Sequence, residues 1–473
     1  MVRLYAALFA IGLAVYGLFA WDRLGTQSPA PHFVYQADAW LSGSFEVAPP
    51  LPNDDWAVLE TVRLDDGTQV TGRRMVTRRA FLTLAKTELP IARVIGHVGW
   101  THHVSFPALP SIIMIPSALI AGRAGNDVIP TVILAALILP LCLLALRRVA
   151  AAGLSARTVR EDLWLVAMLG FGSVLWFSAV QGKVWYTAHV CGVVLALIYT
   201  WASIEARHPL IAGLALGAAA LTRTAMAFMF PLFLFEVWRL ASKHAAAETP
   251  SSSASGSLGQ LNLVAGRAAM RKAVIGPLVR FAIPVIAFAL LGMAYNYVRF
   301  GSLTEFGHTF IALGDHRPVV QQTNIETWGL ASHHYLSRNL AVAFALLPDL
   351  LPHAPWIKIS GHGLAMWFTT PVLFLVVWPR IKNPLHRPLW ITTLFVALPS
   401  LLYMNSGWFQ FGYRFALDYL VFLVLLIAIG GRPLGRVAKA LIVAGIIVNL
   451  FGAYTFARRG QYYGGQNTVV LTN

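Results

Sequence analysis

The chain has 473 residues, of which 57% are hydrophobic and only 12% are charged. A soluble domain carries about 25% charged residues, so about half of the expected charge is missing. The apolar residues fall in blocks of roughly 17–22 positions, which is the length that crosses a bilayer core of about 30 Å as a helix. The alternating ten-residue segments of a transmembrane barrel are not visible. Composition therefore excludes an ordinary soluble domain and predicts an all-α integral membrane protein, a polytopic helical bundle.

The first apolar block, residues 4–21, follows Arg3 and has the features of a signal peptide. However, no small-x-small cleavage pattern follows it, and the next residues are Trp21, Asp22 and Arg23. We therefore expect an uncleaved first membrane span.

Eleven membrane spans are predicted. They lie at 4–21, 128–146, 163–181, 185–204, 209–222, 224–240, 279–299, 362–379, 388–404, 414–430 and 440–457. The segment 104–122 is also apolar, but it carries three prolines within ten residues. If it does not cross, every short basic loop falls on the same side of the membrane as Arg3, as the positive-inside rule requires. We therefore expect an interfacial or re-entrant helix at 104–122.

This topology also explains the net charge of +16. Many Lys and Arg residues lie in short loops next to spans, so the charge encodes orientation and no nucleic-acid partner is expected. The predicted location is a bacterial inner membrane, with the N-terminus cytoplasmic and the C-terminus periplasmic.

Three long stretches lie outside the predicted spans. Residues 22–127 and 300–361 form two periplasmic loops, which hold fourteen of the 20 Asp and Glu residues. Residues 241–275 include a Ser/Gly/Ala-rich segment and are predicted to be a flexible cytoplasmic linker. The linker divides an N-terminal module, 1–240, from a C-terminal module, 276–473.

The strongest catalytic candidate is Asp38, in the sequence HFVYQADAW at residues 32–40. A carboxylate in an apolar, aromatic stretch near the interface is poorly solvated, so its proton affinity should rise. Such a group suits a general base acting on a hydroxyl. The alternative is a helix-capping or hydrogen-bonded Asp on a surface helix.

A second candidate region begins a span at 405–420, with Gln410, Tyr413, Arg414 and Asp418. Charges inside spans are costly and therefore mark functional sites. The guanidinium of Arg414 is well shaped to hold a phosphate. The alternative is an Arg414–Asp418 ion pair that only ties helices together.

A third region leaves a span at 294–310, where Tyr295, Asn296 and Arg299 would line a polar cavity. Simple anchoring at the membrane interface is the alternative for these residues. Arg223 lies at a predicted external turn, and Lys183 begins a span at the same face; either would reach an anionic headgroup or only snorkel.

Metal chemistry is the weakest hypothesis. His97, His102 and His103, with Asp54, Asp55, Asp65 and Asp66, provide ligand types without a recognisable spacing. No nucleotide-binding loop or nucleophile elbow is present. We expect no cofactor, and a divalent metal is the alternative.

Five motifs appear in a definite order: HFVYQADAW, VSFPALPSIIMIPSALI, LALGAAALTRTAM, YNYVRFGSLTEFG and GWFQFGYRFALDYL. Together they resemble the GT-C fold glycosyltransferases that use polyprenyl-phosphate sugars, including protein mannosyltransferases and lipid A aminoarabinose transferases. The resemblance extends over residues 32–420. The chain departs from the family's usual pattern at PALP, residues 107–110, and in having Asp38-Ala39 where many members have Asp-Glu.

The resemblance implies an inverting sugar transfer in which a lipid phosphate leaves. Asp38 would act as general base, and Arg414, Arg223 and Lys183 would hold the donor phosphate. It also implies juxtamembrane helices at 32–43 and 104–122, and a cavity at the outer membrane face. The residues expected to line this cavity are Tyr35, Tyr295, Asn296, Arg299, Gln410, Tyr413 and Asp418.

The leading hypothesis is thus a membrane glycosyltransferase that acts on the periplasmic side. Its expected partners are a polyprenyl-phosphate sugar, membrane lipids and a glycan, lipid or protein acceptor. The alternative is a transporter or flippase of lipid-linked sugars, or a polysaccharide polymerase. A transporter would place its polar residues near the bilayer midplane, whereas the candidates here map to one interface.

Overall fold

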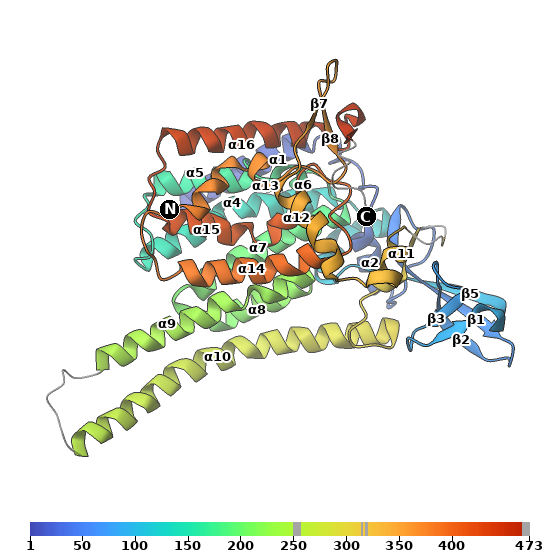
Figure 1. The fold of residues 1–473 in the computed structure, drawn as a ribbon, viewed down its shortest axis with the longest axis horizontal. Helices are drawn as coiled ribbons and strands as arrows, with labels where there is room; N and C mark the ends of the chain where they lie inside the picture. Colours follow the sequence, from blue (N-terminus) through green and yellow to red (C-terminus); the bar gives the residue numbers. More distant parts are fainter. Residues whose placement is uncertain (249–256, 314–315, 317–319, 466–473) are drawn as a thin grey trace.

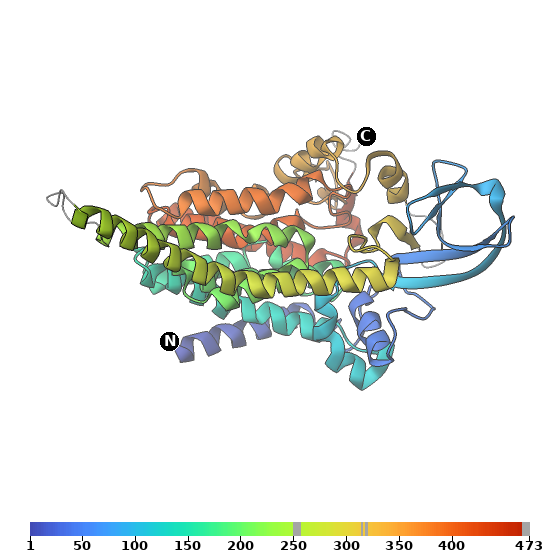
Figure 2. The same cartoon turned by 90° about the horizontal axis from the view of Figure 1, so that it is seen from below.

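The computed structural model describes residues 1–248, 257–313, 316 and 320–465. Helices packed side by side form a bundle, and a β-sheet projects from one end of it (Figures 1 and 2). We call this end of the bundle the sheet end. The chain start and the junction between α9 (Pro231–Glu248) and α10 (Ser257–Phe300) lie toward the opposite end (Figure 1).

Apolar helices build the bundle, as composition predicts. The further long helices are α1 (Val2–Phe19), α4 (Val128–Ala151), α5 (Val159–Gly170), α7 (Val184–Ser203), α8 (Pro209–Ala220), α14 (His386–Leu402), α15 (Leu420–Ile429) and α16 (Arg436–Thr455). Six helical segments in the described part of the chain are long and apolar enough to cross a membrane, judged by length and composition. This supports a membrane protein, whereas the count of eleven spans stays a prediction.

Several predicted spans are interrupted helices. The span at 163–181 divides into α5 and α6 (Leu175–Ala179) around a Gly/Ser-containing turn. The span at 224–240 divides at Pro231 into η4 (Thr224–Met229) and α9. Proline removes a backbone donor and clashes with the preceding turn, so the chain changes its helical geometry there. Similar breaks separate α13 (Met366–Thr369) from η7 (Pro371–Val377), and η8 (Arg414–Asp418) from α15.

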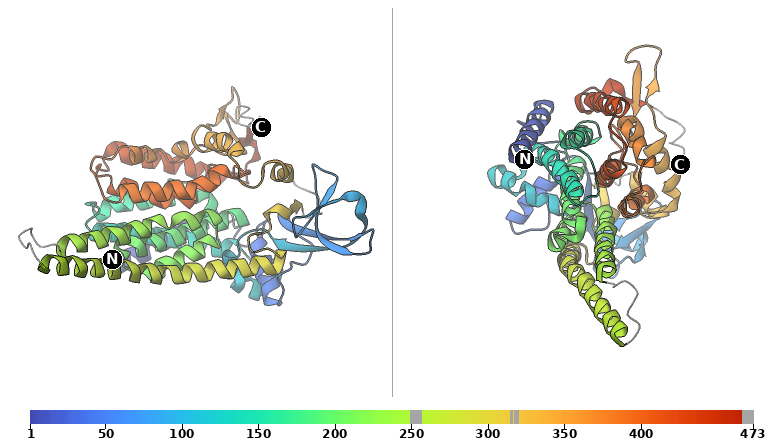
Figure 3. Two further views of the ribbon diagram at one scale, coloured as in Figure 1. Left: turned by 60° about the horizontal axis from the view of Figure 1, so that its bottom comes forward. Right: turned by 90° about the vertical axis from the view of Figure 1, so that its left-hand side faces the viewer.

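The predicted linker is largely helical where it is described. Residues 241–248 continue α9 and residues 257–275 begin α10, while 249–256 lie outside the described residues. Ala, Leu, Lys and Arg in these stretches are strong helix formers, which explains the difference from the expected flexible chain. The first part of α10 stands away from the other helices at the end opposite the sheet (Figure 3).

Helices from the two predicted modules pack against one another. α14 contacts η4 and α9, and η8 lies against α7. Residues on both sides of the linker therefore contribute to the same core. The division into an N-terminal and a C-terminal module stays a prediction.

The expectation of an all-α chain is wrong for the first loop, which contains an antiparallel sheet. Its strands are β1 (Asp54–Leu64), β2 (Gln69–Arg74), β3 (Ala80–Thr83), β4 (Glu88–Pro90) and β5 (Val94–Val104), in the order β4-β3-β2-β1-β5. β6 (Ile311–Leu313), from the second loop, pairs with the start of β1. Val and Thr in β1 and the Asp-Asp-Gly turn that follows it favour a hairpin, which explains the start of this sheet.

The two predicted juxtamembrane segments do form helices. α2 (His32–Leu41) packs on α3 (Leu109–Ala121) through an apolar cluster that includes Phe33, Ala37 and Met114. The 13 residues of α3 extend about 20 Å, which is less than the thickness of a bilayer core. This length agrees with a helix that does not cross.

The second loop contains β6, α11 (Val320–Trp328), α12 (Leu336–Phe344) and the strands β7 (Asp349–Leu350) and β8 (Ile357–Ser360), the last of which pairs with β9 (Tyr463–Gly465). Glu326 in α11 ties this loop to the sheet. Its carboxylate accepts hydrogen bonds from Arg73 Nη1 at 2.5 Å, from the backbone N–H groups of Val76 and Thr77, and from the Thr77 hydroxyl. The Glu326 side chain is fully buried, so its charge depends on these donors.

Replacing Glu326 with Ala should loosen the second loop from the sheet. Arg73 would lose its buried partner and two N–H groups their acceptor, at a cost of about 3 kcal/mol. Limited proteolysis of the purified protein should then cut within 300–345 sooner than in the wild type. Glu88→Ala, which breaks an exposed pair with Arg78 in the same sheet, is the control and should leave the cleavage pattern unchanged. Equal cleavage in the two variants would contradict the role of Glu326.

Candidate active site

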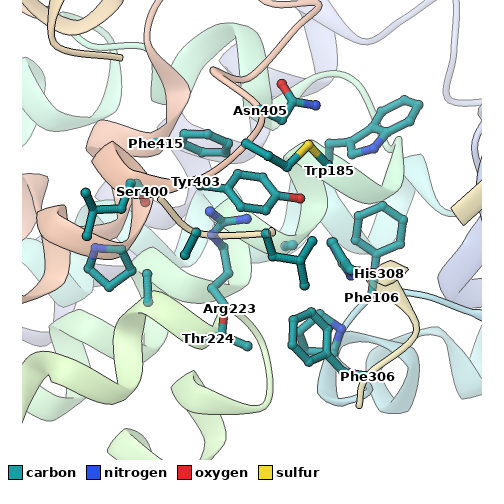
Figure 4. Close-up of a pocket in the computed structure, with 18 of the residues that line it drawn as sticks. Phe106, Trp185, Arg223, Thr224, Phe306, His308, Ser400, Tyr403, Asn405 and Phe415 are labelled. Atoms are coloured by element: carbon teal, nitrogen blue, oxygen red, sulfur yellow. The ribbon is translucent and has the colours of Figure 1, made fainter. Parts of the chain in front are cut away.

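A cavity of about 630 Å³ lies at the sheet end, between the two loops and the ends of several helices. We call it the reaction cavity. Figure 4 shows its lining, in which Arg223 extends toward Tyr403 and Phe415 while His308, Phe106 and Phe306 form the opposite wall. Most of the wall is apolar. The polar or charged side chains that line it include Asp55, Thr222, Arg223, Thr224, His308, Gln321, Tyr403, Asn405 and Arg414.

A backbone irregularity at the start of β1 positions Asp55. The pairing of β1 with β6 shifts register between Asp54 and Trp56, and Asp55 has a φ of 71°. Such a bulge redirects one side chain out of the regular alternation of a strand. The carboxylate thereby meets the indole of Trp185, whose Nε1–H donates to Asp55 Oδ2 at 2.9 Å.

Burial makes the Asp55 carboxylate basic. Removal from water raises the pKa of Asp55 to about 6, although the Trp185 hydrogen bond and the charge of Arg414 act in the opposite direction. Oδ1 accepts no hydrogen bond from the described residues. A group with this pKa is ionised near neutral pH and can take up a proton, as a general base must.

Arg414 supplies the positive charge of the cavity. It is only 4% exposed, and no carboxylate in the described chain lies within salt-bridge distance of it. Its Nη1 donates to the carbonyl of Gly407, and its Nε has no partner among the described residues. The rings of Tyr186 and Phe415 lie 5.4 Å and 5.3 Å from its guanidinium carbon. An uncompensated buried cation with unused donors is suited to bind an anion.

Asp418 forms an ion pair with Arg223. It does not pair with Arg414, which was the alternative to a functional role for Arg414. Arg223 Nε and Nη2 donate to the two carboxylate oxygens at 2.7 Å and 2.9 Å. His189 Nδ1 lies 3.0 Å from Asp418 Oδ1 and completes a buried cluster. Arg223 lines the reaction cavity, but its charge is largely balanced by Asp418.

A second cavity of about 650 Å³ adjoins the first, and we call it the lateral groove. Tyr295, Asn296 and Arg299, which were expected in one site with Arg414, line this groove and not the reaction cavity. The two cavities share three lining residues, Pro107, Thr224 and Phe306.

Asp38 does not lie in one cavity with Arg223 and Arg414, although the resemblance implies that the base and these two arginines act on the same donor. It lines a third pocket, together with Tyr35, Trp100 and Arg123, on the far side of α2. The reason is the helical phase of α2, because Phe33 and Ala37 pack on α3 and Tyr35 and Asp38 share a different face. The role predicted for Asp38 stays a prediction, but the structure separates it from the two arginines.

The remaining predicted residues do not line the reaction cavity. Gln410 bonds the backbone of Ser406, His362 and Arg414, and so fixes the turn that carries Arg414. Tyr413 is buried beside Phe415. Lys183 precedes α7, and it is not one of the side chains that line the reaction cavity.

The sequence indicates Asp55 only as one of the possible metal ligands, and it does not single out Trp185 or His308. Within the described residues, no group of three or more His, Cys, Asp or Glu side chains could hold a metal ion. His102 Nε2 and His316 Nε2 lie 2.8 Å apart, but they are only two such side chains. The sequence signal for Asp55 was the turn-forming Pro-Asn-Asp-Asp before an apolar strand, where irregular backbone is expected.

The chain matches no known family model and no curated protein. Among solved structures, it is similar to the apo form of the Archaeoglobus fulgidus oligosaccharyltransferase, with 11% identity and a TM-score of 0.40. It is also similar to the archaeal oligosaccharyltransferase AglB from Archaeoglobus fulgidus in complex with an inhibitory peptide and a dolichol-phosphate, with 9% identity and a TM-score of 0.41. Each likeness covers 98% of this chain and 56% of the other, so the chain spans about half the length of these proteins. Likenesses this weak do not assign the chain to a family.

The raised pKa of Asp55 should be visible without any substrate. Because Asp55 contacts the indole of Trp185, ionisation of Asp55 should change tryptophan fluorescence with a midpoint near pH 6, the value to which burial raises its pKa. The signal should disappear in Asp55→Asn and persist in Asp54→Asn, the exposed neighbour. A midpoint near pH 4 would show that the carboxylate is well solvated and is not a base of this kind.

Proposed function

We propose that the chain is a membrane glycosyltransferase that moves a sugar from a polyprenyl-phosphate donor to an acceptor hydroxyl at the periplasmic face. One observation carries this proposal. A single, mostly apolar cavity contains both Asp55, a carboxylate with a raised pKa, and Arg414, a buried guanidinium without an acidic partner in the described chain. Base and anion site thus lie together, and we assign the base to Asp55 in place of Asp38.

The proposed reaction is a single displacement at the anomeric carbon. Asp55 Oδ1 takes the proton of the acceptor hydroxyl as the new carbon–oxygen bond forms. The bond between the anomeric carbon and the phosphate oxygen breaks, and the lipid phosphate leaves with an additional negative charge. Arg414 stabilises that charge as it develops, which is the main way a site of fixed charges lowers such a barrier. Attack opposite the leaving group inverts the anomeric centre.

The apolar wall of the reaction cavity suits the lipid part of such a donor. Phe228, Phe395 and Leu398 line the cavity and are also among the exposed hydrophobic side chains. They lie on η4 and α14, two segments that pack against each other. An isoprenoid chain bound there would leave its phosphate near the charged end of the cavity.

The proposed orientation rests on the charge pattern. The sheet end is formed by the two loops that hold fourteen of the 20 Asp and Glu residues, and the short basic loops predicted to be cytoplasmic belong to other connections. The charged side chains that line the reaction cavity, Asp55, Arg223 and Arg414, lie at the sheet end of the bundle, whereas a transporter would hold such groups near its middle. This favours transfer over transport.

Asp55→Asn should lower transfer from a labelled polyprenyl-phosphate sugar in proteoliposomes by about 10²–10⁴-fold, because the acceptor hydroxyl loses its base. In the wild type, the rate should rise with pH up to about pH 6 and level off above it, since Asp55 must be ionised to act. Asp38→Asn is the matched control and should retain most of the activity. If Asp38→Asn abolishes transfer while Asp55→Asn does not, the base is Asp38.

Arg414→Met should weaken donor binding and slow transfer more than Arg414→Lys does. Met removes the charge, whereas Lys keeps it but loses the planar pair of donors that fits a phosphate. We expect losses of about 100-fold and about 10-fold, measured as kcat/KM for the donor, if each hydrogen bond to a charged group contributes about 1.5–3 kcal/mol. Equal activity of Arg414→Met and wild type would exclude a role in binding the leaving group.

A further inference from the structure

The lateral groove has the layout of a site for an anionic amphiphile. Its walls come from α3, from α10 and from the C-terminal end of α8 with the following Leu221, and they are almost entirely apolar, with Ile112 and Leu291 among them. Ile112 and Leu291 are 53% and 60% exposed, on helices that have the composition of membrane segments. One end of the groove is polar, because Tyr295, Asn296 and Arg299 lie there.

Arg299 provides an uncompensated cation at that polar end. It is 6% exposed, and the described residues place no carboxylate within salt-bridge distance of it. It donates to the carbonyl of Val104 at 2.8 Å and to Asn296 Oδ1 at 3.2 Å, with a long contact to the carbonyl of Tyr295. A guanidinium has five N–H donors, so at least two remain for a ligand.

Tyr295 holds the guanidinium in place. The ring of Tyr295 lies 3.9 Å from the Arg299 guanidinium carbon, and its hydroxyl accepts hydrogen bonds from Gln36 and Trp40 of α2. Stacking on a fixed ring limits the freedom of the side chain, so little order has to be imposed when an anion binds.

We propose that the lateral groove binds a second anionic lipid, with its phosphate at Arg299 and its chain along α3, α8 and α10, and that this lipid is the acceptor. The acceptor assignment rests on the proposed function; the binding site does not. The reaction cavity and the lateral groove each have an apolar wall and an arginine without a carboxylate partner among the described residues, so two lipids are bound at once. The wall of Pro107, Thr224 and Phe306 that the cavities share brings the headgroup of the second lipid next to the reaction cavity.

The number of bound lipids tests the site. Native mass spectrometry of the purified chain titrated with farnesyl phosphate should show two bound equivalents in the wild type. Arg299→Met and Arg414→Met should each weaken one equivalent at least tenfold. Farnesol should bind more weakly, and excess inorganic phosphate should not displace farnesyl phosphate, because the apolar chain contributes most of the binding.

A second variant guards against misfolding of Arg299→Met. Ile112→Trp fills the groove from an exposed position and should also remove one equivalent. Ile120→Trp lies on the same helix, is 86% exposed and does not line the groove, so it should still bind two. A single equivalent in the wild type, or two in both Arg299→Met and Ile112→Trp, overturns the site.

The acceptor assignment has its own readout. When membranes of cells that express the chain receive a labelled donor, the label should extract with the lipids, and Ile112→Trp should lower this signal at least tenfold relative to Ile120→Trp. Label on protein or on a water-soluble glycan overturns the lipid acceptor. Failure of the proposed function would appear differently, as an absence of transfer with both binding equivalents retained.

Discussion

The cost of burying an arginine away from water governs the arrangement of this molecule. A buried guanidinium needs a carboxylate, a set of acceptors or an external anion. Arg223 has the first of these, because Asp418 holds it with two hydrogen bonds. Arg414 and Arg299 have only neutral acceptors from the described residues. Arg414 and Arg299 thus lack a carboxylate partner among the described residues, and in the two proposals an anionic ligand takes that place.

The proposed acid–base chemistry depends on a contact between the β-sheet and the helical bundle. Asp55 belongs to the sheet, and Arg414 belongs to the bundle. The Trp185 hydrogen bond joins the two, since it links the first turn of α7 to the start of β1. Glu326 and the β1–β6 pairing hold the second loop over the same place. The site is therefore positioned by several weak connections between the sheet and the bundle, and not by one rigid element.

The sequence predicted the helical bundle well because long apolar blocks have few alternatives in a bilayer. It also singled out Arg223 and Arg414, since charges in apolar blocks are conspicuous, and the structure has both in the lining of one cavity. It did not reveal which carboxylate joins them. Asp38 has the more suggestive sequence neighbours, but it lies on a face of α2 that points away from the two arginines. Which face of α2 packs against which partner cannot be read from the sequence of that helix alone. Asp55 is placed by a register shift with a strand about 255 residues later, which no local pattern contains.

The pairing of β6 with β1 has a consequence for how the chain is made. A ribosome completes β1 through β5 long before residues 311–313 emerge, so the open edge of β1 stays without its last partner while several helices enter the membrane. Until β6 arrives, the bulge that directs Asp55 does not exist. A newly synthesised chain would then lack the proposed base until residues 311–313 have paired with β1.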